Sequence, residues 1–172
     1  CTKEALQKLA NAGVTTYHHN LESSRRFYPN VCTSHTYDDR VNTIKNAKAV
    51  GLNVCSGGIF GLGETIEDRI DMALDLRTLD IHSVPINVLT PIPGTPFENN
   101  EEVNPFEILK TISIYRFILP KSFLRYCGGR IKLGEHAKTG LRCGINSALT
   151  GNFLTTTGTT IETDKKMIKE LG

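Results

Sequence analysis

The fold is decided by the stretch Asn53-Val54-Cys55-Ser56-Gly57-Gly58-Ile59-Phe60-Gly61-Leu62-Gly63-Glu64, in which an apolar run ends in a cysteine and opens into four closely spaced glycines. Glycine weakens a strand, so this density indicates that something approaches the backbone closely. Cys55, Gly57 and Ile59 alternate along the chain, and alternate residues of a strand face the same side of a sheet. That side offers a soft ligand, an open backbone and an apolar surface, which suits a metal cluster beneath a flat organic ligand.

Length, net charge and cysteine content limit the classes of protein to which this chain can belong. The chain has 172 residues and a net charge of +2 spread along its length, which favours one domain and shows no nucleic-acid or membrane-binding pattern. It begins without Met and shows no signal peptide, and no apolar run approaches the length of a membrane span. Its five cysteines are an odd number without CxxC spacing, which argues against a disulfide framework and a self-contained zinc site. We therefore expect a reducing, cytoplasmic setting.

Helices are expected from caps and from apolar spacing. Two segments read as capping boxes, Thr36 to Asp39 and Thr65 to Asp68. After the second box, the spacing predicts a buried stripe of Ile66, Ile70, Ala73 and Leu74. The expected helices cover residues 2–12, 36–50, 65 onward, 104–119, 133–143 and 162–171.

Five short runs between these helices read as strands, at residues 15–21, 52–59, 83–89, 122–127 and 146–151. Strands that alternate with helices indicate parallel βα units. Because eight strands close a βα barrel, five leave either an open α/β sheet or a barrel without its first three units. The start on a helix, without a preceding strand or an initiator Met, favours a partial (β/α)8 TIM-type barrel of strands four to eight. We expect an open arc of parallel strands with helices on one face only.

Polar side chains gather where a barrel places its site, at the carboxyl ends of the strands. His18, Asn20 and Glu22 share one face of the first strand. Asn87 is the only side-chain amide in the third strand, and a buried amide either pairs within the protein or binds a ligand. Arg125 lies in an otherwise apolar strand, so its guanidinium needs a carboxylate or another electron-rich partner.

In these strands the chain resembles the biotin synthase family of radical S-adenosylmethionine enzymes. Five segments look, in order, like strands four to eight of that family's barrel: Tyr17 to Glu22, Val54 to Glu64, Pro85 to Asn87, Leu124 to Arg130, and Gly144 to Thr156. The similarity covers essentially all 172 residues, so residues 1–172 would be the C-terminal part of one radical S-adenosylmethionine barrel domain. The resemblance implies sulfur insertion that converts dethiobiotin to biotin, with S-adenosylmethionine, a [4Fe-4S] cluster and a sacrificial [2Fe-2S] cluster.

The resemblance assigns roles position by position. Cys55 and Arg125 match the thiolate and the arginine ligand of the [2Fe-2S] cluster, and they are the candidate catalytic and metal-binding residues. The residues that match S-adenosylmethionine contacts are Asn20, Glu22, Arg40, Gly57 and Ile59. Those that match dethiobiotin contacts are His18, Asn20 and Asn87 around the ring urea, with Thr155 and Thr156 as candidates for the carboxylate. His18 departs from the family, whose other members carry Asn there, although an imidazole still donates one hydrogen bond.

The sequence also lacks parts of the family pattern. The CxxxCxxC loop that binds the [4Fe-4S] cluster is absent, as are two further cysteine ligands of the [2Fe-2S] cluster. Cys1 stands too close to the end of the next helix to be one of them. We therefore expect the chain alone to be inactive. For a full-length protein the resemblance implies an electron donor such as flavodoxin or ferredoxin, a homodimer, and neither nucleic acid nor membrane as a partner.

Other readings of the same residues remain open. A radical S-adenosylmethionine barrel of the hydrogenase-cofactor maturase type is the nearest rival, but it has no need of both Cys55 and Arg125 on those strands. A metal-free βα-barrel lyase would leave Cys55 merely packed in the core. A binding module gains little support from a charge balance near neutrality.

Overall fold

The computed structural model describes residues 1–152 and 158–171, and its centre is a parallel sheet. The strands of the sheet are β1 (Thr16–His18), β2 (Asn53–Cys55), β3 (Gly58–Phe60), β4 (Ser83–Val88), β5 (Phe123–Tyr126) and β6 (Ser147–Ala148). They pair in chain order, β1-β2-β4-β5-β6, with β3 beside β4, and each pair is parallel. Parallel pairs in chain order are what repeated βα units produce.

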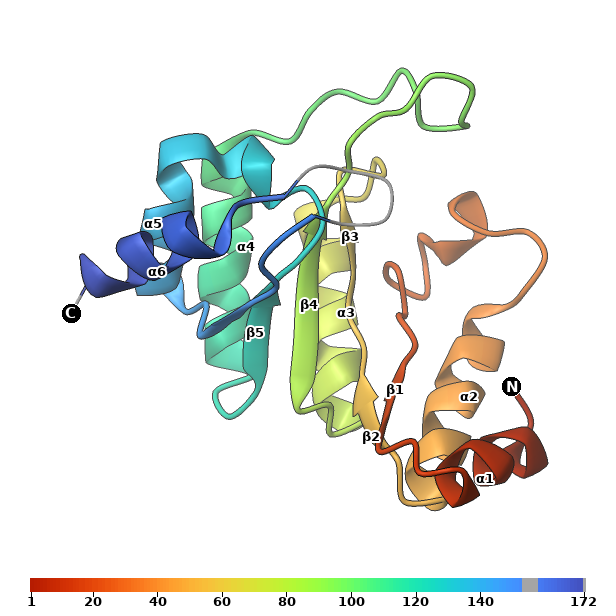
Figure 1. Cartoon of the computed structure of the whole chain (residues 1–172). Coiled ribbons are helices and arrows are strands. Elements are labelled where there is room, and N and C mark those ends of the chain that lie inside the picture. Colours follow the sequence, from red (N-terminus) through yellow and green to blue (C-terminus); the bar gives the residue numbers. More distant parts are fainter. Residues whose placement is uncertain (153–157, 172) are drawn as a thin grey trace.

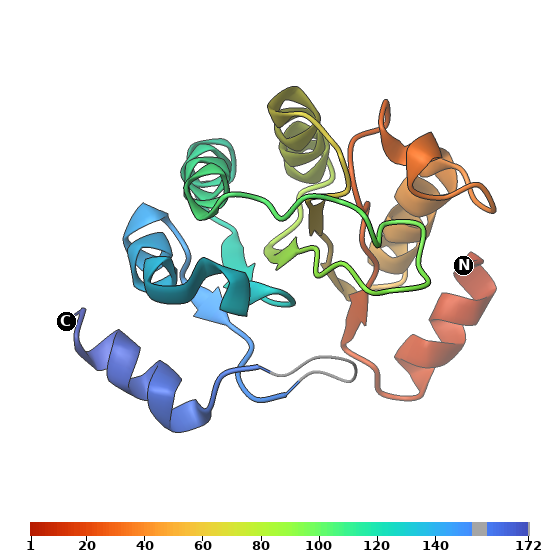
Figure 2. The ribbon, with the colours of Figure 1, turned by 90° about the horizontal axis from the view of Figure 1, so that it is seen from above.

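The helices cover one side of this sheet. They are α1 (Lys3–Asn11), α2 (Tyr37–Ala49), α3 (Ile66–Thr78), α4 (Pro105–Ile118), α5 (Ala137–Cys143) and α6 (Ile161–Lys169), with short 3-10 segments η1 (Tyr28–Asn30) and η2 (Arg130–His136). Seen from above, the helices follow the outer side of a curved row of strands, and α1 and α6 lie at its two ends (Figure 2). The predicted α/β fold, an open arc of parallel strands with helices on one face, is confirmed.

The predicted strand over residues 52–59 is interrupted, and the structure gives the reason. Its two parts, β2 and β3, both pair with β4 in one register, because Cys55 pairs with Ser83 and Gly58 with Ile86. At the break, a Cβ on Gly57 would lie 2.2 Å from the carbonyl oxygen of Pro85. The close approach that the glycines indicated is therefore made at Gly57 by the protein's own neighbouring strand.

The predicted starts of the helices agree with the structure better than the predicted buried face does. Thr36 and Asp39 form the capping box of α2, and Thr65 and Asp68 form that of α3. Of the buried stripe predicted for α3 only Ala73 is confirmed, because Leu74 is 45% exposed and the buried residues are Asp68, Arg69, Met72, Ala73 and Leu76. The two polar residues of this set make ion pairs near the start of the helix. Asp68 pairs with Arg26, and Arg69 pairs with Glu64.

The core lies between the sheet and the helices. Its largest buried side chains include Phe60 on β3 and Tyr115 on α4, whose rings meet edge to face with centroids 5.6 Å apart. The segment between β4 and α4 runs above the carboxyl ends of the strands (Figure 1). Among the described residues, no helix is both long enough and apolar enough to span a bilayer.

A glycine substitution tests the packing at the strand break. In the full-length protein, Gly57→Ala should lower the free energy of unfolding by about 3 kcal/mol, because the added methyl group meets a backbone carbonyl that has no room to move. Ser56→Ala is the matched control, since the fully buried Ser56 hydroxyl has no hydrogen-bond partner among the described residues. Urea denaturation measures both variants. Equal stability of the two variants would contradict this account.

Candidate functional site

A cavity of about 420 Å³ opens at the carboxyl ends of the strands. Its walls come from four neighbouring strands and the loops that follow them, and the lining residues that carry chemistry are His18, Asn20, Glu22, Ile59, Asn87 and Cys127. The alternation predicted for the first strand therefore brings three polar side chains to one cavity. In parallel α/β folds this edge of the sheet is where ligands bind.

Asn20 and Glu22 form one wall of the cavity. The Asn20 amide accepts a hydrogen bond from the Gly57 N–H at 3.1 Å and donates to a Glu22 carboxylate oxygen at 3.3 Å. Glu22 has a φ of 71°, a left-handed conformation that is unfavourable for residues other than glycine. Its carbonyl oxygen accepts from the Ile59 N–H at 3.0 Å and lies where a Cβ on Gly58 would be 2.5 Å away. Gly58 thus allows the unusual turn at Glu22.

Arg40 approaches Glu22 from α2. Its Nη1 lies 3.9 Å from a Glu22 carboxylate oxygen, and its Nε donates to the Tyr28 hydroxyl at 2.9 Å. Burial raises the pKa of Glu22, while the charge of Arg40 and the hydrogen bond from Asn20 oppose that rise. Arg40 does not line the cavity itself, but it pairs with the carboxylate of Glu22, which lines it.

Asn87 uses its amide within the protein while it lines the cavity. Its Nδ2 donates to the Gly58 carbonyl at 3.0 Å, and its Oδ1 accepts from the Gly128 N–H at 3.1 Å. It therefore ties β3 to the turn that follows β5. A primary amide has two N–H donors and two acceptor lone pairs, so half of its capacity is left for a ligand.

Strand register places Cys55 and Arg125 on the side of the sheet where the cavity lies, although neither residue lines the cavity itself. Cys55 pairs with His18 and Arg125 with Pro85, and both of these partners line the cavity. Cys55 is 5% exposed, with the Ser83 hydroxyl 3.4 Å from its sulfur. Desolvation and then the charge of Arg125 lower the pKa of His18, so this imidazole stays neutral at pH 7.

Cys127 faces the same cavity as Arg125, as its position two residues further along the strand indicates. Burial raises the pKa of its thiol to about 12. The remaining predicted site residues are distributed differently. Gly57 is covered by Pro85 and does not line the cavity, and Thr155 and Thr156 lie outside the described residues. Within residues 1–152 and 158–171 there is no cluster of three or more His, Cys, Asp or Glu side chains that could hold a metal ion.

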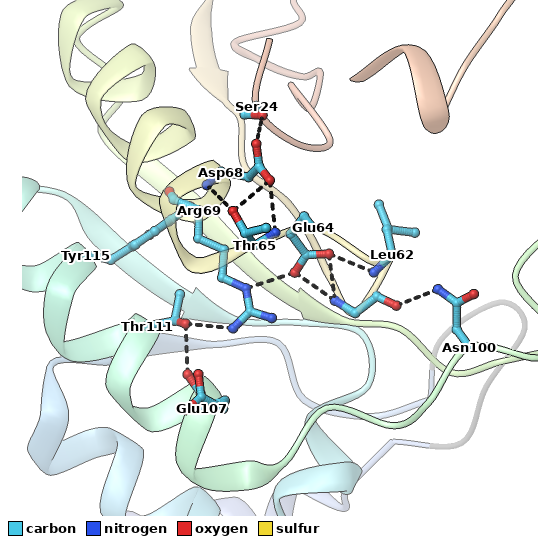
Figure 3. A network of polar contacts seen from close by, with 11 residues as sticks. Ser24, Leu62, Glu64, Thr65, Asp68, Arg69, Asn100, Glu107, Thr111 and Tyr115 are labelled. Carbon is cyan, nitrogen blue, oxygen red and sulfur yellow. Dashed lines mark hydrogen bonds and ion pairs between the residues drawn. The ribbon is translucent and has the colours of Figure 1, made fainter. Parts of the chain in front are cut away.

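A buried polar network around the loop that follows β3 was not predicted (Figure 3). Glu64 accepts hydrogen bonds from the N–H groups of Gly61 and Leu62 and pairs with Arg69 at 2.8 Å. Arg69 also donates to the Thr111 hydroxyl at 3.1 Å. The network fixes the loop after β3, the strand that presents Ile59 to the cavity. The sequence feature that could have indicated this network is Glu64, which directly follows a glycine-rich turn.

His19 faces away from the cavity-lining residues of its strand. It is a titratable group in an unusual environment. Its Nε2 is buried without a hydrogen-bond partner among the described residues, and its ring stacks on that of Tyr17 with centroids 6.1 Å apart. Burial, together with the charge of Arg40, lowers the pKa of His19 to about 4.

Two families match the chain. Residues 85–172 match the "Biotin and Thiamin Synthesis associated domain" and residues 1–76 match the "Radical SAM superfamily". Over all 172 residues the chain is 95% identical to a biotin synthase of Fusobacterium nucleatum subsp. nucleatum, and over 171 residues it is 59% identical to one of Campylobacter hominis. It covers 48% and 53% of these proteins, so the chain spans about half the length of the curated relatives it matches.

Solved structures share the fold. A methylornithine synthase is similar with a TM-score of 0.77 and 23% identity, over 99% of this chain and 55% of that one. The FeFe-hydrogenase maturase HydG from Carboxydothermus hydrogenoformans gives a TM-score of 0.74 and 19% identity, over 99% of this chain and 45% of that one. At such low identity these matches establish the arrangement of strands and helices only.

The pKa of His19 predicts how stability depends on pH. Between pH 6.5 and about 4 the unfolded chain binds a proton at His19 that the folded chain does not, so the free energy of unfolding falls as the pH falls. In the full-length protein, His19→Gln should remove part of this decrease, because glutamine does not titrate. The measurement is the difference in melting temperature between pH 7 and pH 5 for both proteins. A difference that is unchanged in the variant would rule out His19 as its source.

Proposed function

Since the chain belongs to the family of the Biotin and Thiamin Synthesis associated domain, we propose that it is the C-terminal part of a biotin synthase, which converts dethiobiotin to biotin by radical S-adenosylmethionine chemistry. The observation that carries the proposal is the 95% identity to a biotin synthase over the full length of this chain. The cavity supports it, because polar side chains and an apolar surface for a flat ring line the same space.

We further propose that residues 1–172 form the C-terminal part of a single barrel. The two family matches meet within one sheet, since β3 of the first match pairs with β4 of the second along three residue pairs. Strands β1 and β6 end the described sheet and each has one neighbour in it. Because β2 and β3 are the two parts of one strand, the sheet supplies five barrel strands, and three further βα units between the two edges would complete the eight.

S-adenosylmethionine would bind beside β1 and β3. The carboxylate of Glu22 and the amide of Asn20 are acceptors suited to ribose hydroxyls, and Ile59 offers an apolar contact to the adenine. Arg40 would attract the carboxylate of the methionine part, as its charge lies next to Glu22. Gly57 would contribute through its backbone, because its N–H orients Asn20.

Dethiobiotin would bind between His18, Asn20 and Asn87. Its ring urea needs donors for one carbonyl oxygen and acceptors for two N–H groups, and the neutral imidazole and two amides supply both kinds. Each amide is already fixed by hydrogen bonds to the backbone, so little side-chain freedom is lost on binding. Thr155 and Thr156 stay candidates for the substrate carboxylate.

Cys55 and Arg125 would hold a [2Fe-2S] cluster together with two ligands from outside this chain. The donor set fits, because a buried thiol on the cavity face becomes a thiolate on binding iron, which is the usual ligand of such clusters. When bound, the cluster supplies the sulfur atom for the product. Cys127 lines the cavity as a neutral thiol beside these ligands. The residues of the chain therefore orient the substrates and exclude water.

The remaining parts of the reaction would come from outside this chain. These are the CxxxCxxC loop with its [4Fe-4S] cluster, an electron donor such as flavodoxin or ferredoxin, and a second subunit. All five cysteines are unpaired with one another, which supports a reducing, cytoplasmic location. A maturase is the weaker candidate, as its solved structures are about 20% identical to the chain while the curated biotin synthases reach 52–95%.

The test of the function uses the full-length protein, reconstituted anaerobically with iron and sulfide. It should show charge-transfer absorbance and form biotin from dethiobiotin, S-adenosylmethionine and a reductant. A metal-free lyase would show neither. Reconstituted protein that carries its clusters and still makes no biotin would overturn the assignment.

The cluster assignment predicts a loss of iron on substitution of Cys55. Cys55→Ser in the reconstituted full-length protein should keep about two thirds of the wild-type iron and sulfide, because a hard hydroxyl replaces a soft ligand of the [2Fe-2S] cluster and the [4Fe-4S] cluster is unaffected. Cys143→Ser is the matched control, since Cys143 lies at the end of α5 on the helix side of the sheet. Iron and sulfide analysis gives the result. Equal iron in the two variants would exclude Cys55 as a ligand.

The substrate assignment predicts weaker binding on substitution of Asn87. Asn87→Ala should weaken dethiobiotin binding by about 1–3 kcal/mol, because a polar group of the ring urea then loses its hydrogen-bond partner in the cavity. Asn11→Ala, at the exposed end of α1, serves as the control. Anaerobic titration calorimetry measures both. An affinity equal to that of the wild type would remove Asn87 from the site.

A further inference from the structure

Arg130 and Asp164 form a buried ion pair between two parts of the chain that lie far apart in sequence. Nη2 of Arg130 donates to both carboxylate oxygens of Asp164, at 2.9 and 2.8 Å. The Thr159 hydroxyl donates to the same carboxylate at 3.0 Å. The two charged side chains are 5% and 8% exposed. We call these two residues the C-terminal ion pair.

The C-terminal ion pair is the main attachment of α6. Among the described residues of this helix, Asp164 is the only buried one, and the apolar side chains of Ile161 and Ile168 are 48% and 54% exposed. A second link, between Lys138 and Glu170 at 2.7 Å, is solvent-exposed. Buried ion pairs hold their partners in one geometry, whereas exposed pairs contribute little. The position of α6 therefore depends on Arg130.

The Arg130 end of the pair reaches the cavity through two glycines. Gly128 and Gly129 line the cavity and directly precede Arg130. A Cβ on Gly129 would lie 1.9 Å from the Val88 carbonyl oxygen, so this turn packs tightly against β4. The Gly128 N–H is also the group that holds the Oδ1 atom of Asn87. A shift of Arg130 would thus move a partner of Asn87.

The Asp164 end of the pair reaches a different wall of the cavity. Leu149, which lines the cavity, is held by a hydrogen bond from its N–H to the Tyr126 carbonyl at 2.8 Å. Two residues further on, the Gly151 N–H donates to the carbonyl of Thr159 at 2.9 Å, and the Thr159 side chain contacts Asp164. The C-terminal ion pair therefore joins the turn after β5 to the segment after β6.

We propose that Arg130 and Asp164 are positioning residues that set the dethiobiotin side of the cavity without touching the substrate. The proposal rests on the function given above. The C-terminal ion pair joins the walls formed by Asn87, Gly128 and Leu149. Two candidate S-adenosylmethionine residues, Glu22 after β1 and Ile59 on β3, make no hydrogen bond or ion pair to Arg130 or Asp164 among the described residues. Loss of the pair therefore affects one of the two substrates.

The test compares steady-state kinetics of full-length, reconstituted variants. D164A should raise the KM for dethiobiotin about tenfold and leave the KM for S-adenosylmethionine within about twofold, since a small misplacement of binding groups has effects of this order. D164N, which keeps an acceptor for Thr159, should lie between D164A and the wild type. R130M combined with D164A should be no worse than D164A alone, because the two residues act as one unit. E170A, which breaks only the exposed pair on the same helix, should leave both KM values within about twofold.

Two kinetic outcomes would overturn the proposal. In one, D164A lowers the melting temperature but leaves the KM for dethiobiotin unchanged, which would make the pair merely structural. In the other, the KM values of both substrates rise equally. If D164A does not fold, hydrogen exchange of the wild type decides, because dethiobiotin should slow the exchange of amides in α6, and unchanged exchange would refute the coupling. A wild type that makes no biotin would instead refute the proposed function, whatever the variants do.

Discussion

The buried ion pair of Glu64 and Arg69 is the interaction on which the geometry of the cavity depends. The two side chains are 2% and 8% exposed, and charges taken so far out of water are stable only when their hydrogen-bonding groups are satisfied. Glu64 meets this condition with the backbone N–H groups of the turn after β3, and Arg69 meets it with Thr111 and with the ring of Phe60, 5.4 Å from its guanidinium carbon. The pair thereby joins β3, α3 and α4 into one unit that carries Ile59 (Figure 3).

The same pair shows where sequence reasoning succeeds and where it stops. Local signals were reliable: both capping boxes, the parallel order of the strands and the shared face of His18, Asn20 and Glu22 agree with the structure. The buried face of α3 was not predictable from apolar spacing, because Arg69 is buried through a partner five residues before it. Apolar periodicity assumes that charged residues stay in water, and that assumption fails where two charges are buried together.

The site raises a related point about side-chain amides. From the sequence, the Asn87 amide could either pair within the protein or bind a ligand. In the structure it pairs with two backbone groups and also lines the cavity, so it can do both. Which backbone groups an amide reaches depends on strands that are far apart in sequence, so no local pattern reveals it. An amide held in this way has its orientation fixed before a ligand arrives, which reduces the entropy lost on binding.

The left-handed backbone of Glu22 has a consequence for how this protein changes over evolutionary time. A residue with a side chain in this conformation costs about 1–3 kcal/mol relative to a relaxed backbone, and glycine would avoid most of that cost. Replacement by glycine would also remove the carboxylate from the cavity. Selection for heat resistance alone would therefore drift toward glycine at this position, and a library screened only for folding should enrich it. The glutamate at residue 22 thus keeps a carboxylate in the cavity at the expense of backbone stability.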